Sequence, residues 1–229
     1  MRAVRMGEVV TLLFFGGCQC SSSNKDVLSR GANVYQKVTG DDSDSDRSQW
    51  DQVFDRGAYV FGKEPADILK EVVDILPVGR ALDIAMAEGR NAVFLARKGF
   101  VVDGVDISEV GIRKAKRLAR ENHVDITTIN ADLNTYQIKP DSYEVILNIQ
   151  YLQRSLIPQM KRGLKRGGVV IFENHTTAQL SLPGSAGMRR DFLLNPGELK
   201  EAFAEFKILS YKETNDGKNA NASLVAMKP

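Results

Sequence analysis

The sequence predicts an α/β protein built on a doubly wound, mostly parallel sheet of seven strands. Short apolar segments alternate with amphipathic ones between residues 80 and 204, which is the pattern of parallel strands joined by crossover helices. An apolar strand ending near Ala85 is followed by a tight turn and an apolar helix, and the next strand ends in the acid Asp106. The chain closes with two further strand-like segments around an Asn215-Asp-Gly217 turn, which predicts an antiparallel hairpin.

Each element follows from its local pattern. Parallel strands are expected near residues 80–85, 101–106, 126–130, 143–149 and 168–173, and the hairpin strands near 206–213 and 222–227. Helices are expected near residues 50–55, 65–76, 90–98, 109–121, 155–165 and 196–204. The helix that starts at Pro65 shows the clearest periodicity, with an apolar face made of Ile68, Leu69, Val72, Val73 and Leu76.

Composition narrows the function classes. The chain has 229 residues and a net charge of +2, which argues against a strongly electrostatic nucleic-acid binder. No apolar stretch reaches the length of a transmembrane helix, so we expect no stable membrane insertion of the domain. The only cysteines, Cys18 and Cys20, precede the predicted domain, for which we therefore expect no disulfide, no cysteine nucleophile and no metal site.

Five short motifs resemble, in order, those of the class I S-adenosylmethionine (SAM) methyltransferases. Asp83-Ile-Ala85-Met-Ala87-Glu-Gly89 resembles motif I, usually Asp-x-Gly-x-Gly-x-Gly, and keeps only its last glycine. The other four are Val101 to Ser108, Asn130-Ala-Asp-Leu133, Ser142 to Asn148 and Leu164-Lys-Arg-Gly-Gly168. The extension Glu88-Gly-Arg-Asn-Ala-Val-Phe-Leu-Ala96 is similar to the tellurite-resistance and thiopurine-type small-molecule methyltransferases. The resemblance covers residues 50–229.

This resemblance implies a Rossmann-like methyltransferase that uses SAM and methylates a small molecule, either a thiol or a tellurite- or selenite-type oxyanion. No nucleic acid is expected as a partner, because the Asn/Asp-Pro-Pro-Tyr signature of base methylation is replaced by Asn148-Ile-Gln-Tyr151. The alternative is a degenerate or lipid-anchored protein that keeps the fold without transferring methyl groups, since Ala85 and Ala87 replace two glycines of motif I. An alanine held at positive φ at position 87 would carry strain on the order of 1–2 kcal/mol.

The resemblance also assigns residues to SAM binding. Asp106 would accept hydrogen bonds from the ribose hydroxyls, and Ile107 would pack on the adenine, whose amino edge would meet Asp132. Asp106 and Asp132 follow strands, so a helix N-cap is the alternative role for each of them. The full expected set is Asp83, Ala85, Ala87, Gly89, Asn91, Asp106, Ile107, Asp132, Leu133 and Asn148.

Three residues are candidates for the methyl-transfer step. Tyr151 follows the fourth strand, where this fold presents groups to the transferring methyl, or else it packs under the next helix. His175 follows the fifth strand and is a candidate proton acceptor. Arg189 lies with Arg190 in the long loop after that strand, where it would bind an oxyanion or, alternatively, pair with Asp191.

A short aromatic segment precedes the domain. Tyr59 and Phe61 stand before Pro65 in a Tyr…Gly…Glu-Pro pattern that resembles a lid of the tellurite and thiopurine group. These two rings would attract the sulfonium of SAM by cation–π interaction, or they would form a hydrophobic staple for the helix at Pro65.

Residues 1–20 resemble a signal or lipobox-like leader, because a short apolar core ends in Gly-Gly-Cys18 behind two arginines. A working lipoprotein signal would be cleaved and lipidated at Cys18, which gives a lipid-anchored location as the alternative. Glu8 at the edge of the core and the cytoplasmic origin of SAM favour a cytoplasmic protein. Residues 21–48 are expected to be a flexible polar linker and residues 49–229 the methyltransferase domain. The sequence leaves the oligomeric state open.

Overall fold

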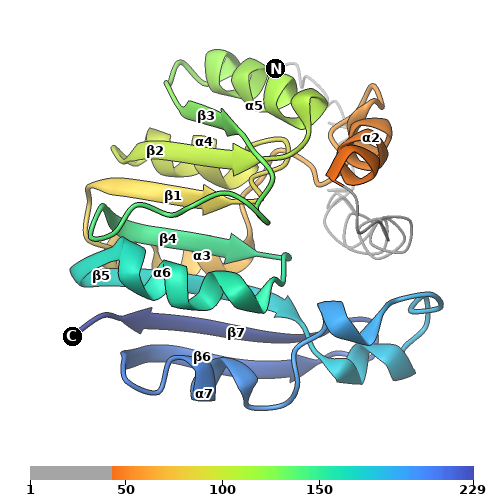
Figure 1. The fold of residues 1–229 in the computed structure, drawn as a ribbon, viewed down its shortest axis with the longest axis vertical. Helices are drawn as coiled ribbons and strands as arrows, with labels where there is room; N and C mark the ends of the chain where they lie inside the picture. Colours follow the sequence, from red (N-terminus) through yellow and green to blue (C-terminus); the bar gives the residue numbers. More distant parts are fainter. Residues whose placement is uncertain (1–42) are drawn as a thin grey trace, which may run out of the picture.

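The computed structural model describes residues 43–229, so the expected leader and most of the expected linker lie outside the described residues. One seven-stranded sheet has the order β3-β2-β1-β4-β5-β7-β6 (Figure 1). Strands β1 to β5 are parallel, and β7 is antiparallel to β5 and β6, which confirms the predicted fold class. The strands are β1 (Arg80–Ile84), β2 (Val101–Asp106), β3 (Thr127–Asn130), β4 (Tyr143–Ile149), β5 (Leu164–His175), β6 (Lys207–Asn215) and β7 (Ala220–Met227).

The described α-helices are α2 (Ser43–Phe54), α3 (Asp67–Val72), α4 (Arg90–Arg97), α5 (Glu109–Glu121), α6 (Ile157–Gly163) and α7 (Glu198–Ala202). Single 3-10 turns are η1 (Val73–Ile75), η2 (Arg154–Leu156), η3 (Thr177–Ser181) and η4 (Arg190–Phe192). Strand β5 starts four residues before the expected strand, because Leu164 already pairs with Tyr143 ahead of a register shift. None of the helices between residues 43 and 229 is long and apolar enough to cross a bilayer.

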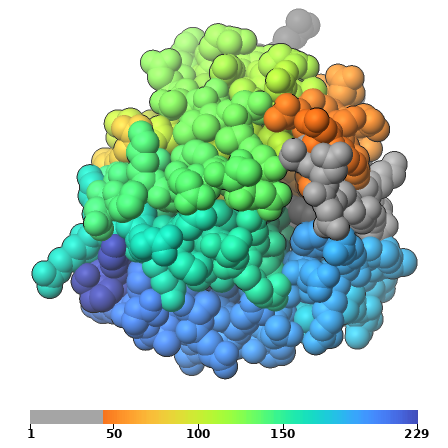
Figure 2. All heavy atoms as spheres, viewed as in Figure 1, coloured from red at the N-terminus to blue at the C-terminus, as the bar shows by residue number. Residues whose placement is uncertain are grey.

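Helix α2 corrects the expected boundary between linker and domain. It begins at Ser43, so residues 43–48 are helical rather than part of a flexible linker. Asp44 and Asp46 lie in its first turn, where the helix dipole favours negative charge. Figure 2 shows α2 (orange) on the outside of the molecule, beside the yellow-green residues of α5. Because α2 packs on the strand-end side of the sheet, it belongs to the domain.

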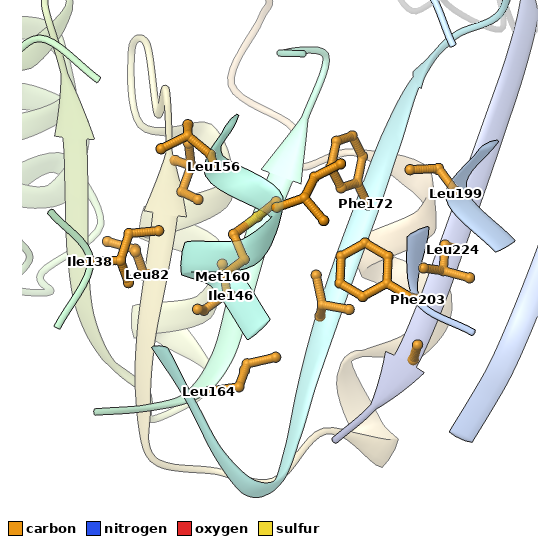
Figure 3. Close-up of a cluster of buried hydrophobic side chains, with 14 of the residues drawn as sticks. Leu82, Ile138, Ile146, Leu156, Met160, Leu164, Phe172, Leu199, Phe203 and Leu224 are labelled. Carbon is orange, nitrogen blue, oxygen red and sulfur yellow. The ribbon is translucent and has the colours of Figure 1, made fainter. Parts of the chain in front are cut away.

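Apolar side chains cover both faces of the sheet. On one face, α6 and α7 pack against the strands, and Figure 3 shows Met160, Phe172 and Phe203 meeting between them. On the other face, α3 and α4 contribute buried residues such as Leu69 and Leu95. A parallel sheet covered in this way exposes its strand ends, where polar groups can gather.

The long loop between β5 and α7 is closed at its base. The Leu194 N–H donates to the carbonyl of His175 at 2.9 Å, and the Thr177 N–H donates to the carbonyl of Leu194 at 2.8 Å. The guanidinium of Arg154 donates to the carbonyl of Leu193 at 2.9 Å. The two ends of the loop are therefore fixed beside each other and beside η2.

Candidate functional site

A cavity lies at the carboxyl ends of the parallel strands, the edge to which the arrows β1, β2 and β4 point in Figure 1. The loop after β1 lines it with Ala85 and Ala87, and α2 lines it with Trp50 and Phe54. Ligands of doubly wound sheets bind at this edge because the loops after the strands converge there. The cavity is therefore the candidate functional site.

The loop after β1 keeps a glycine-type backbone although it contains two alanines. Ala85 and Ala87 both have a φ of 52°, in the left-handed region. Gly89 has a φ of 81°, and a Cβ added to it would lie 2.6 Å from the Cβ of Ala115 in α5. Position 89 thus requires glycine for two reasons, conformation and space, whereas the strain at positions 85 and 87 comes from the conformation of the alanines.

Replacing Ala87 with glycine is expected to stabilise the fold by about 0.5–1 kcal/mol. Relief of a left-handed alanine gains about 1–2 kcal/mol, and the greater freedom of glycine in the unfolded chain offsets about 0.4–1 kcal/mol. Denaturant unfolding measures the difference. Ala92→Gly in α4 is the matched control, because a glycine inside a helix should destabilise by about 1 kcal/mol. Equal destabilisation by both variants would contradict the strain at position 87.

Asp106 lines the cavity at the end of β2. One carboxylate oxygen accepts from the Ala87 N–H at 2.8 Å and the other from the Ser108 N–H at 2.8 Å. Ser108, not Asp106, caps α5, since its hydroxyl accepts from the Gly111 N–H, so the alternative of an N-cap at Asp106 is wrong. Burial raises the pKa of Asp106 to about 6. The carboxylate is thus ionised at pH 7 and keeps lone pairs for a ligand.

Asp132 also lines the cavity and is not a helix N-cap, because a turn rather than a helix follows it. Its carboxylate accepts from the Asn134 N–H at 2.8 Å. Ile107 and Leu133 line the same region and supply apolar surface beside the two acids. The predicted acids at successive strand ends are therefore brought to one cavity.

Asn91 joins the cavity to the segment before α3. Its side chain lines the cavity, and its Oδ1 accepts from the Ala66 N–H at 2.9 Å. The position predicted for cofactor binding thus also anchors the chain entering the domain.

Three residues expected to contact the cofactor lie outside the lining of the cavity. Asp83 is 2% exposed beneath the loop, where the Ala92 N–H at the start of α4 donates to its carboxylate. Burial raises the pKa of Asp83 to about 7, and the charge of Arg90 opposes this shift. Asn148 is fully buried, with its amide 3.9 Å from the sulfur of Met160. The third, Gly89, packs on α5 as described above.

Two of the three candidates for the transfer step line the cavity. The Tyr151 hydroxyl donates to Oε1 of Gln153 at 2.7 Å, and burial raises the pKa of this tyrosine above its usual range. His175 is 4% exposed, and its Nδ1 has no hydrogen-bond partner among residues 43–229. Burial lowers the pKa of His175, so the ring is neutral at pH 7. A neutral imidazole with an available nitrogen is a proton acceptor.

Arg189 does not line the cavity, which corrects the prediction made for it. It is exposed, its guanidinium lies 3.3 Å from Oδ2 of Asp191, and its charge sits over the Phe192 ring at 5.1 Å. The salt-bridge alternative is the observed one. The reason is that the loop is anchored at its base, and its exposed part turns these side chains toward solvent.

Several lining residues were not predicted as cofactor or catalytic residues. Trp50 and Phe54 come from α2, and Glu88 and Arg90 follow the end of β1. The Glu88-Gly-Arg90 motif was the available signal for the second group. Gln150, which stands beside Tyr151 after β4 as the sequence suggested, lines the cavity as well. Of the two aromatic residues before Pro65, Phe61 lines the cavity. Tyr59 instead packs beside α5, where Lys114 lies 5.5 Å from its ring. No group of three or more metal-binding side chains occurs in the part of the chain that the structure describes.

Comparison with known proteins identifies a matching family and several distant relatives. A family model described as "Tellurite resistance protein TehB" matches residues 52–222. The "Probable S-adenosyl-L-methionine-dependent methyltransferase TehB" of Haemophilus influenzae is 25% identical over 150 residues, which are 62% of this chain and 52% of that protein. The chain therefore spans about half the length of this curated relative.

Two further similarities are a shorter sequence match and a solved structure. The 23S rRNA (uracil(747)-C(5))-methyltransferase of Pyrococcus abyssi is 31% identical over 80 residues, 35% of this chain and 19% of that protein. The crystal structure of TehB from Haemophilus influenzae superposes with a TM-score of 0.62 at 21% identity, covering 80% of this chain and 67% of that one. At this identity the structural likeness establishes the fold.

Proposed function

Because the chain belongs to the TehB family, whose model matches residues 52–222, we propose that it transfers the methyl group of SAM to a small molecule. The observation that carries the proposal is the cavity in which Asp106 and Asp132 lie together at the ends of neighbouring strands. Hydroxyl and amino groups of a nucleoside need such acceptors. The function requires access to SAM, and we therefore propose that the protein acts in the cytoplasm.

The residues that line the cavity fit a cationic cofactor. The described lining residues include one guanidinium, that of Arg90, and four carboxylates. The four are Asp46, Glu88, Asp106 and Asp132. Lys114 pairs with Glu88 at 2.8 Å, but Asp106 and Asp132 still supply negative charge. Negative charge in a confined cavity favours a sulfonium cation, and the rings of Trp50 and Phe61 add cation–π attraction.

The chain's own part in the reaction is positioning and water exclusion. SAM, when bound, would supply a methyl group already activated by its sulfonium sulfur, so a strong general base is not required. Phe61 and α2 cover the cavity and keep water from the acceptor. The neutral imidazole of His175, which lines the cavity, would take up the proton that a protonated acceptor releases when it gains the methyl group.

For the acceptor, we propose a thiol first and a tellurite- or selenite-type oxyanion second. A neutral thiol fits a cavity whose charged lining residues are four carboxylates and one guanidinium, with His175 as its proton acceptor. The family name favours the oxyanion, but Arg189 lies outside the cavity and leaves Arg90 as the guanidinium that lines it. A nucleic acid is disfavoured because the chain has a net charge of only +2. Strongly salt-dependent RNA affinity would contradict this choice.

The test is calorimetric titration of SAM and S-adenosylhomocysteine into the full chain, followed by mass spectrometry of products from thiols, selenite and tellurite. Binding and a methylated thiol are the expected results. A methylated oxyanion with no methylated thiol would reverse the order of the acceptors. A folded protein that binds neither nucleoside would support the hypothesis of a degenerate protein that does not transfer methyl groups. Lipid labelling at Cys18 would support the hypothesis of a lipid-anchored protein.

Replacing Asp106 with alanine is expected to weaken SAM binding about 30-fold, which corresponds to one charge-assisted hydrogen bond of about 2 kcal/mol. Calorimetry measures the dissociation constant. Asp125→Ala, which removes an exposed carboxylate in the segment between α5 and β3, is the control and should bind as the wild type does. Unchanged affinity in Asp106→Ala would remove this acid from the cofactor site.

A further inference from the structure

Two chains of hydrogen bonds connect the candidate cofactor elements to the outer wall of the cavity. This wall consists of helix α2, which lines the cavity with Trp50 and Phe54, and of Phe61. Trp50 stacks on Phe54 with ring centroids 5.5 Å apart, and Phe54 meets Phe61 edge-on at 6.1 Å. The three aromatic residues therefore form one continuous surface.

The first chain of contacts starts in the loop after β1 at Glu88. This side chain is 2% exposed, and its Oε2 accepts from the Val60 N–H at 2.6 Å and the Phe61 N–H at 3.3 Å. Its other oxygen accepts from Lys114 Nζ at 2.8 Å. Lys114 in turn donates to the carbonyl of Ala58 at 2.9 Å. One buried ion pair thus holds the backbone of the segment that carries Phe61.

The second chain of contacts starts at Asp106. The Ser108 N–H donates to Oδ1 of Asp106 at 2.8 Å, and the Ser108 hydroxyl donates to Oδ1 of Asp51 in α2 at 2.6 Å. The Val110 N–H donates to the same Asp51 oxygen at 3.0 Å. Helix α2 is therefore tied to the residue proposed to hold the ribose of SAM.

We propose that Glu88 and Asp51 are positioning residues that fix the aromatic wall of Trp50, Phe54 and Phe61 over the cavity. The loop after β1 and Asp106, which would bind the cofactor, thereby also determine the position of the wall that the methyl acceptor meets. The proposal rests on the proposed function for the identity of the cofactor. The placement of the wall itself depends only on the contacts above. Cofactor bound to the loop after β1 and to Asp106 then restrains the wall, and the acceptor meets a site that SAM has already ordered.

The chain offers a direct readout, because Trp50 is its single tryptophan. Acrylamide quenching of Trp50 fluorescence reports how closely α2 is held, with and without SAM. In Glu88→Gln one remaining acceptor oxygen cannot serve both Lys114 and the Val60 N–H, so one contact is lost. Asp51→Ala removes both contacts to α5 while alanine preserves the helix. Both variants are expected to raise the quenching constant about twofold, as local opening exposes the ring.

The matched controls are Asp55→Ala and Glu109→Gln, which change exposed carboxylates beside α2 and in the first turn of α5. Both should quench as the wild type does. In the wild type, SAM should lower the quenching constant, and in Glu88→Gln this protection should shrink. A structural role alone would lower the unfolding midpoint without changing the protection of Trp50 by SAM.

Two results separate this proposal from the proposed function. Wild-type quenching in folded Glu88→Gln and Asp51→Ala, with SAM binding intact, overturns the positioning role and leaves the methyltransferase proposal standing. Raised quenching in the variants of a protein that does not bind SAM supports the placement of the wall and overturns the methyltransferase proposal. If Glu88→Gln does not fold, Asp51→Ala decides the matter, because its change lies on the exterior helix.

Discussion

Replacing Gly89 with alanine is expected to lower the free energy of unfolding by about 3 kcal/mol. The new Cβ would lie 2.6 Å from the Cβ of Ala115 at a φ of 81°. Left-handed alanine costs about 1–2 kcal/mol, and overpacking of a tight contact costs about 1–3 kcal/mol. Denaturant unfolding measures the loss, and SAM binding should fall with it because α4 would shift against the loop after β1.

Two further variants divide this effect into its parts. Gly99→Ala, just after α4, is the control for conformation alone, since it has a φ of 91° and no atom within 4 Å of a new Cβ. It should cost about 1 kcal/mol. Ala115→Gly alone should cost about 1 kcal/mol because it places a glycine inside α5. In that background Gly89→Ala no longer meets the Ala115 Cβ, so its additional cost should fall by the packing part. Equal losses in Gly89→Ala and Gly99→Ala would show that the contact with Ala115 carries no energy.

Replacing Asp83 with asparagine is expected to stabilise the fold at pH 8 by about 2 kcal/mol and to flatten its pH dependence. Burial raises the pKa of Asp83 from 3.8 to about 7, and Oδ2 has no hydrogen-bond partner among residues 43–229. The folded state therefore binds this proton more tightly than the unfolded state. The resulting stability is complete below pH 3.8 and is lost as the pH rises to about 7.

Each unit of pKa difference corresponds to about 1.4 kcal/mol, and part of the gain is offset because the new amide needs hydrogen-bond partners of its own. Unfolding curves between pH 4 and 8 measure the effect as the difference between variant and wild type. That difference isolates Asp83 from Asp106, whose pKa is also raised. Asp125→Asn, an exposed carboxylate, should give a curve parallel to that of the wild type. A parallel curve for Asp83→Asn would mean that Asp83 does not titrate in this range.

The fold could be predicted because strand ends, helix starts and the final turn leave local signals. The order of apolar segments and the Asn215-Asp-Gly217 turn predicted seven strands and a final hairpin, and the family resemblance placed that hairpin at the antiparallel edge of the sheet. The start of α2 was missed because its acidic first turn has the composition of a linker. The contacts of Asp51 with Ser108 and Val110, which join residues far apart in the sequence, show that this helix belongs to the domain.

The candidate site was predicted in part, because only some of its residues leave a local signal in the sequence. Asp106, Asp132 and His175 stand at strand ends, and parallel topology alone brings such residues to one edge. Asn148 also ends a strand, but the alternation of side chains turns it toward Met160 in the core. Arg189 was misplaced because nothing local in the sequence shows where an anchored loop turns its side chains.

The closed base of the loop between β5 and α7 determines how far this loop can change in length without loss of stability. Its ends are held by the backbone pairing of His175 and Thr177 with Leu194, and by Arg154. Once the ends of a loop are fixed, each doubling of its length costs only about 0.6 kcal/mol of closure entropy. Within the loop, Ser185 is buried and donates to the carbonyl of Gln179 at 2.5 Å, so this position is constrained. Insertions at the exposed residues 186–187 are expected to be nearly neutral for folding, and the loop can vary in length there while His175 stays in place.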